Sequence, residues 1–125
     1  MNPRMLFIAL VLITHSWANA EEKTPAPWDG RPKPLNGDYQ IYGGSLGDSV
    51  PPTAKDRKVT FLLKGPLGKE LFDQIGPDLK LACSDAPGYR ERRRGDLSCT
   101  HDDSGYRCYF GLDVPTGKSM NGSIC

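Results

Sequence analysis

Four cysteines constrain the fold more than any other feature of this sequence. They are Cys83, Cys99, Cys108 and Cys125. None of their spacings gives the C-x-x-C pair that is typical of zinc knuckles and thioredoxin-like sites. An even number of cysteines in an exported chain indicates disulfides. We therefore expect two disulfide bonds, no metal site and no cofactor.

The spacing of the cysteines does not determine how they pair, because four cysteines allow three pairings. We favour Cys83 with Cys99 and Cys108 with Cys125. The alternative bond between Cys99 and Cys108 would run directly across two strands, where we expect strained disulfide geometry. A bridge that closes a loop of this length is worth about 3 kcal/mol in the chain-entropy model.

The N-terminus, residues 1–20, has the features of a secretory signal peptide. Arg4 supplies a positive charge, Met5–Ile13 is an uninterrupted apolar run, and Ala18–Ala20 is an A-x-A cleavage signal. The apolar run is shorter than the roughly 20 residues that a membrane-spanning helix needs. We expect cleavage after Ala20, export to a periplasm or the medium, and no transmembrane segment in the mature chain.

The charge of the mature chain excludes some classes of partner. The whole sequence has 16 Lys and Arg against 15 Asp and Glu, so loss of Arg4 with the signal leaves a formally neutral protein. A neutral chain has no global attraction to nucleic acid or to an anionic membrane, and we expect no nucleic-acid partner. A single domain is expected at this length, and its thin core would benefit from disulfides.

Residues 21–38 form a Pro-rich tail ahead of the domain. Its prolines are Pro25, Pro27, Pro32 and Pro34. Such a segment is extended and polyproline-like. It is either a flexible tether or a strap that Trp28 anchors to the domain, and the sequence does not separate these alternatives. Ordered structure is expected to begin near Asn36-Gly37, with a single α+β domain over residues 39–125.

One helix is predicted over residues 66–75. Pro66 suits a first helical turn, and Gly76-Pro77 provides a stop. The apolar residues between them recur at helical spacing. They are Leu67, Leu71, Phe72 and Ile75.

Short alternating segments predict the strands of an antiparallel sheet. The expected strands are 39–42, 58–64, 79–83, 97–100 and 106–113, with 123–125 as a further edge strand. Residues 97–113 form a hairpin around a turn at 101–105, and residues 84–96 are a polar loop. The predicted fold class is α+β, with a small sheet of about five short strands and one packed helix, stapled by disulfides.

A run of arginines lies in the predicted polar loop. Its members are Arg90, Arg92, Arg93 and Arg94. Guanidinium groups suit carboxylates and phosphates, so the run is a candidate partner-binding surface. The alternative is a solvated loop whose charge nearby aspartates balance.

His101-Asp102-Asp103 is the one weak candidate for catalysis. His101 could act as a general base oriented by Asp102 or Asp103. Nothing in the sequence marks a nucleophile or a metal set beside it. The alternative is a loop-tip histidine next to two aspartates that favour a turn.

These features favour a non-enzymatic, exported binding protein that contacts a protein or an anionic envelope component. An inhibitor or an immunity-type partner is one form of this hypothesis. One alternative is a small secreted hydrolase that uses His101 as general base. Another is a structural accessory of the cell envelope.

Overall fold

A computed structural model describes residues 27–125. The predicted signal peptide and the first part of the Pro-rich tail lie outside the described residues. Residues 27–31 belong to a different compact unit from residues 32–125. No helix or strand is present between residues 27 and 36, and Trp28 is exposed. Whether the tail is a tether or a strap stays a prediction.

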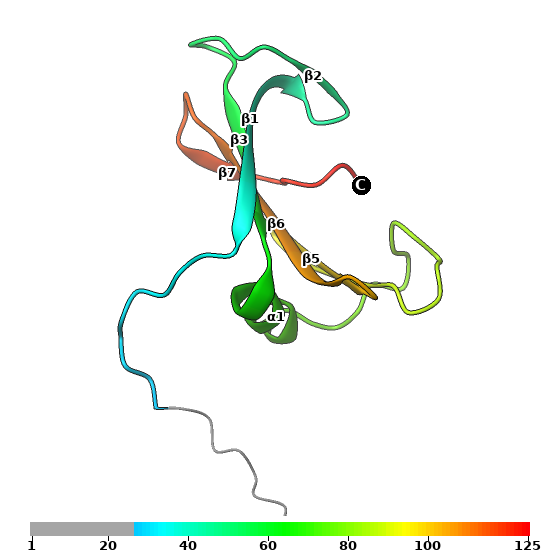
Figure 1. Ribbon diagram of the computed structural model, residues 1–125. Helices are drawn as coiled ribbons and strands as arrows, with labels where there is room; N and C mark the ends of the chain where they lie inside the picture. Colours follow the sequence, from blue (N-terminus) through cyan, green and yellow to red (C-terminus); the bar gives the residue numbers. More distant parts are fainter. Residues whose placement is uncertain (1–26) are drawn as a thin grey trace, which may run out of the picture. The chain divides into compact units, whose positions relative to one another are not determined.

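The domain consists of one helix and a seven-stranded antiparallel sheet (Figure 1). The elements are β1 (Gly37–Ser45), β2 (Asp48–Val50), β3 (Lys58–Leu63), α1 (Gly65–Gln74), β4 (Arg90–Arg94), β5 (Leu97–Asp102), β6 (Gly105–Asp113) and β7 (Lys118–Met120). The strand order is β2-β1-β3-β6-β5-β4, and β7 pairs with β6. The predicted α+β class is confirmed, with more strands than expected.

Helix α1 covers one face of β5 and β6 and forms the core there. It lies within one residue of the predicted range, because Pro66 favours the first turn and Gly76-Pro77 follows the end. Phe72, which is 1 % exposed, and Ile75 pack against Cys99 and Cys108. Partly buried apolar side chains surround this centre: Leu63, Leu71, Leu97 and Tyr106.

The interval between α1 and β5 differs from the prediction. Residues 79–83 do not form a strand, and Leu81 is 93 % exposed. The predicted loop at 84–96 instead contains β4, the edge strand that pairs with β5. Edge strands of soluble proteins are often charged. Strand β4 therefore lacks the apolar alternation by which strands are recognised in a sequence.

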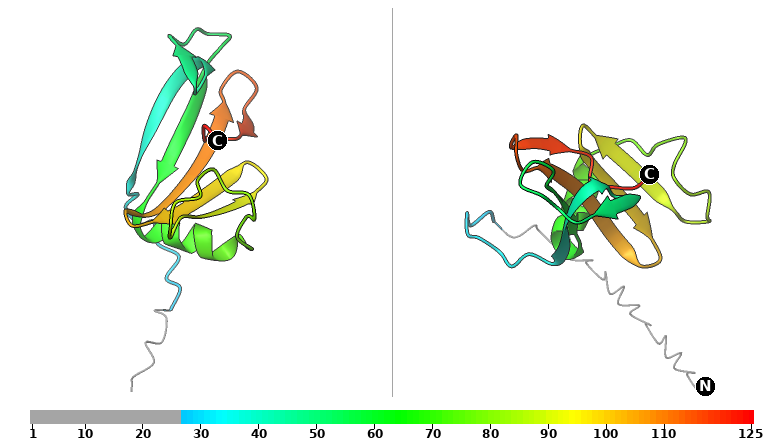
Figure 2. Two further views of the ribbon diagram at one scale, coloured as in Figure 1. Left: turned by 90° about the vertical axis from the view of Figure 1, so that its right-hand side faces the viewer. Right: turned by 90° about the horizontal axis from the view of Figure 1, so that it is seen from above.

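The predicted hairpin is confirmed with a tighter turn. Asp102 pairs with Gly105, so the turn consists of Asp103 and Ser104 alone. The predicted edge strand at residues 123–125 is wrong, because the last strand is β7, and residues 121–125 leave the sheet ladder. This segment lies on the side of the sheet away from α1 (Figures 1 and 2).

Both disulfides form, and no described cysteine is free. The favoured pairing is wrong, because the bonds are Cys83–Cys125 and Cys99–Cys108. Cys99 and Cys108 are direct partners in the β5–β6 register, with Cα atoms 4.0 Å apart, so the cross-strand bond forms. The chain after β7 returns to bring Cys125 Cα within 5.8 Å of Cys83 Cα.

Two disulfides in a domain of this size are compatible with an oxidising extracellular environment. None of the helices found in residues 27–125 is long and apolar enough to cross a membrane.

Candidate functional site

The sheet has two chemically different faces, because successive side chains of a strand point to opposite sides. Directly paired residues share a face, so the register follows each face across the strands. One row on the face opposite α1 runs across β1, β3, β6, β5 and β4. Its members are Asp38, Leu62, Tyr109, Ser98 and Arg93. We call this side of the sheet the open face.

The open face contains a groove of about 530 Å³. It is lined by three tyrosines and three aliphatic residues, which are Tyr39, Tyr89, Tyr109, Leu46, Leu62 and Ile124. The serine and threonine residues of the lining are Thr60, Ser98, Thr100 and Ser123. The size falls within the range of ligand sites, and such sites combine an apolar lining with a few polar groups.

The charged residues of the groove are mostly acidic. Asp38, Glu91 and Asp102 line it, against Arg107 as the basic member of the lining. Hydrogen bonds from the Ser104 side chain and backbone N–H hold the pKa of Asp102 below its usual range. Asp102 is therefore ionised at neutral pH. Because Lys64 pairs with Asp38 and Arg93 pairs with Glu91, the lining has no excess of positive charge that would attract an anionic ligand.

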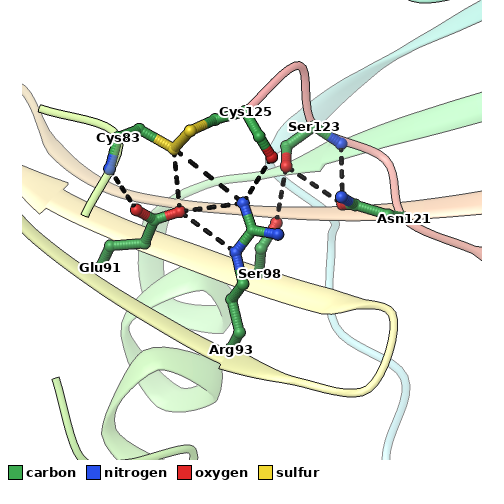
Figure 3. The surroundings of a disulfide bond; sticks show 7 residues. All are labelled: Cys83, Glu91, Arg93, Ser98, Asn121, Ser123 and Cys125. Carbon is green, nitrogen blue, oxygen red and sulfur yellow. Dashed lines mark hydrogen bonds and ion pairs between the residues drawn. A yellow bond between two sulfur atoms is a disulfide. The ribbon is translucent and has the colours of Figure 1, made fainter. Parts of the chain in front are cut away.

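Residues 121–125 form one wall of the groove, and we call them the wall segment. The Thr60 hydroxyl donates to Gly122 O at 2.6 Å, and Ser98 Oγ lies 3.2 Å from Ser123 Oγ. Arg93 Nη2 donates to Cys125 O at 2.7 Å. Figure 3 shows this contact beside the Cys83–Cys125 disulfide. The wall segment is thus attached to the sheet by side chains of the open face, and to Cys83, outside the strands, by one disulfide bond.

Glu91 is the most buried charged residue of the groove, at 3 % exposure. Its carboxylate accepts hydrogen bonds from the Cys83 backbone N–H at 2.8 Å and from Arg93 Nη2 at 3.1 Å (Figure 3). These partners compensate the cost of burying a charge. Cys83, Glu91 and Cys125 also place potential metal-ligand atoms within 4.8 Å of one another. Both sulfurs belong to the disulfide, however, and a disulfide offers no thiolate to a metal.

Strand alternation separates the arginines of the predicted binding surface. Arg90 Nε and Arg92 Nε contact the two carboxylate oxygens of Asp78, at 2.7 and 2.6 Å. Arg92 also donates to Phe72 O at 2.8 Å, and its guanidinium lies 4.2 Å from the centre of the Phe72 ring. Arg93 lies on the open face with Glu91.

The structure therefore does not present the run as one free cationic surface. Arg90, Arg92 and Arg93 have intramolecular acidic partners, whereas Arg94 is exposed and forms no ion pair within residues 27–125. The partners are not the aspartates closest in the predicted loop. Asp78 comes from the segment after α1, and the sequence contains no local signal for that contact.

Asp78→Asn is expected to lower the free energy of unfolding at neutral pH by no more than about 1 kcal/mol, because water screens a carboxylate that is 40 % exposed. Hydrogen bonds from Arg90 and Arg92 lower the pKa of Asp78 from 3.8 to about 2. A lowered pKa stabilises the fold above the unfolded value, and that stabilisation disappears as the pH falls through the folded value. The difference in unfolding free energy between wild type and variant should therefore disappear as the pH falls from about 4 to about 2.

Urea titrations at several pH values would measure this difference. Asp85→Asn is the control. Asp85 is exposed in the same segment between α1 and β4, and it has no ion pair among the described residues. An unfolding energy of Asp78→Asn equal to that of Asp85→Asn at neutral pH would contradict the ion-pair assignment.

His101 and its two neighbouring aspartates do not come together as the hydrolase hypothesis requires. His101 lies on the α1 side, with its ring centre 4.3 Å from that of Tyr106 and 6.1 Å from that of Phe72. Its Nδ1 is buried and has no hydrogen-bond partner within residues 27–125. Asp102, the next residue in β5, lines the groove on the open face, and Asp103 lies in the turn. A His101–Asp102 pair is thus prevented by strand alternation.

Comparison of the chain with protein-family models, curated proteins and solved structures gives no match. The functional conclusion therefore depends on the groove and its surroundings. The sequence analysis did not assign Leu62, Thr60 or Thr100 to a site. The period-two pattern that identified β3 and β6 also implies a second face of each strand. The mixture of tyrosine, leucine and hydroxyl side chains on that face is the sequence signal that could have indicated a binding site.

Proposed function

We propose that the protein is an exported, non-enzymatic binding protein and that the open-face groove holds an extended segment of a partner protein. The groove itself is the observation that supports this most strongly. It combines three tyrosines and three aliphatic side chains with hydroxyl and carboxylate groups on a face that α1 leaves uncovered. Export is supported by the N-terminal signal sequence and by the two disulfides.

The charges of the groove favour a peptide segment over an anionic envelope component as the ligand. Lys64 pairs with Asp38 and Arg93 pairs with Glu91, and the remaining charged residues of the lining are Asp102 and Arg107. The groove therefore has no excess of positive charge that would attract an anionic envelope component. A neutral or basic peptide segment with apolar side chains fits both the charge and the lining. An inhibitor or immunity-type protein would use such a groove to hold one loop of its target.

Enlarging a side chain on the floor of the groove should block binding. Thr100 lies on the open face between Glu91 and Arg107 in the register. Peptides selected from a displayed library against the wild type should bind Thr100→Tyr at least about tenfold more weakly, because the added ring occupies their space. Isothermal calorimetry would measure the affinities.

The matched control is Val114→Tyr, which adds the same ring at an exposed position outside the groove lining. It should bind like wild type. A second comparison uses Arg94→Ala, because Arg94 is the exposed arginine of the run. If Arg94→Ala abolishes binding while Thr100→Tyr does not, the arginine run is the site and the groove proposal is wrong.

A further inference from the structure

We infer that the Cys83–Cys125 disulfide is a site of thiol–disulfide exchange with an external dithiol, and that its opening releases the wall segment of the groove. The exchange reaction is inferred from the exposure and the surroundings of this disulfide alone. Its effect on ligand binding rests on the proposed function of the groove.

The two disulfides differ in access to solvent. Cys99 and Cys108 are both 0 % exposed and lie in the core under α1. Cys83 and Cys125 are both exposed and lie outside every strand. Because exchange requires a thiolate to reach a disulfide sulfur, only the second bond is open to attack in the folded protein.

The charges around the exposed disulfide distinguish its two sulfurs. Glu91 Oε1 lies 3.2 Å from Cys83 Sγ, and Arg93 Nη2 lies 4.0 Å from the same sulfur (Figure 3). The carboxylate repels an anionic nucleophile from Cys83. The Arg93 guanidinium pairs with Glu91, so it offsets the effect of this carboxylate on a thiolate that develops on Cys83 as the leaving group. The arrangement therefore directs attack to Cys125.

The reaction is balanced by the dithiol alone. A thiolate of the dithiol attacks Cys125 Sγ, forms a mixed disulfide, and displaces Cys83 as a thiolate that keeps the electron pair of the broken bond. The second thiol of the reagent, as its thiolate, attacks the mixed disulfide and releases Cys125. The dithiol is oxidised to its disulfide, the two cysteines are reduced, and the two protons of the dithiol end on Cys83 and Cys125. The new Cys83 thiol can then donate to Glu91 Oε1.

Opening this bond changes the groove and leaves the sheet ladder unchanged. The disulfide bond attaches the wall segment, through Cys125, to Cys83 in the segment between α1 and β4. Gly122 remains buried against Phe110 and Thr60, at the start of the wall segment. Beyond it, the remaining polar contacts with the sheet are single hydrogen bonds, between Ser98 and Ser123 and from Arg93 to Cys125. Release of Ser123 and Ile124 removes one side of the groove.

Reduced glutathione tests the exchange, because a monothiol traps the first step. The folded protein is treated briefly with it, acidified, labelled with N-ethylmaleimide and analysed by peptide mass. The expected product has glutathione on Cys125, maleimide on Cys83 and an intact Cys99–Cys108 bond. Equal cleavage of both disulfides, or glutathione on Cys83, would overturn the inference.

Arg93→Gln should slow this reaction about fivefold, since it removes the cation that offsets Glu91 beside the leaving thiolate. Arg93→Lys should retain most of the rate, which separates the effect of charge from a loss of structure. Arg94→Gln is the matched control, because Arg94 is exposed and has no ion pair in the described part of the chain. A wild-type rate for Arg93→Gln would overturn the assigned role of Arg93.

The consequence for binding is measured on protein reduced at this bond and alkylated on both cysteines. A selected peptide should bind it about tenfold more weakly than the oxidised protein. Unchanged affinity would overturn release of the wall as a control of binding. If no peptide binds even the oxidised protein, the proposed function fails, and the glutathione labelling pattern still decides the exchange reaction.

Discussion

Phe72→Ala is expected to lower the free energy of unfolding by about 3–5 kcal/mol, the usual cost of removing a buried phenyl ring. Phe72 is the largest fully buried side chain among the described residues and packs in one cluster with both cysteines of the buried disulfide. Its ring also lies 5.4 Å from that of Tyr106 and under the guanidinium of Arg92. Removing it leaves a cavity where α1 meets the sheet. Urea denaturation followed by far-UV circular dichroism would measure the change.

Leu67→Ala is the matched control on the same helix. Leu67 is 37 % exposed, so its truncation removes less buried apolar surface and should cost less than about 1 kcal/mol. If Phe72→Ala were no more destabilising than Leu67→Ala, the packing of α1 on the sheet would be wrong.

The double variant Cys99→Ala, Cys108→Ala is expected to lose about 2–5 kcal/mol, which is typical of removing a native disulfide from a small secreted domain. The bond joins β5 to β6 at the centre of the core, and both residues are fully buried. The variant therefore loses a constraint on its unfolded chain and also leaves two small cavities beside Phe72. Thermal unfolding of the oxidised proteins would measure the loss.

The control for this variant is Ser119→Ala with Thr116→Ala, which changes two exposed side chains outside the core. These changes should shift the melting temperature far less. An unchanged melting temperature of the cysteine variant would contradict the position of this bond in the core. Peptide mapping that found Cys83–Cys99 and Cys108–Cys125 would contradict the described pairing directly.

Elements marked by local signals could be predicted from the sequence. Helix α1 has a proline at its start, Gly-Pro after its end and an apolar stripe between them. Strand β3 and the β5–β6 hairpin have period-two alternation. These signals act between residues that are close in the chain, so they can be identified without knowing the tertiary structure.

Long-range contacts explain the errors. Strand β4 is stabilised by pairing with β5 and by Asp78, and its arginines gave no apolar pattern. The return of Cys125 to Cys83 depends on the path of the wall segment across the sheet. Neither contact has a signature within a few residues of the sequence.

The candidate site could be predicted only in part. The residues singled out were the arginine run and His101, because charged and titratable side chains are conspicuous in a sequence. The structure assigns Arg90 and Arg92 to ion pairs beside Phe72, and it places His101 on the α1 side of the sheet. The groove consists of ordinary strand residues such as Leu62, Thr100 and Tyr109, which become a site only when five strands lie side by side.

Amide chemical shifts of the labelled protein, recorded during titration with a selected peptide, test the central claim most directly. Binding in the groove predicts that the largest changes occur at Ser98, Thr100, Tyr109 and Ile124. Changes concentrated at Arg94 and the Asp103-Ser104 turn, with the groove residues unaffected, would contradict the claim that the open face is the binding surface.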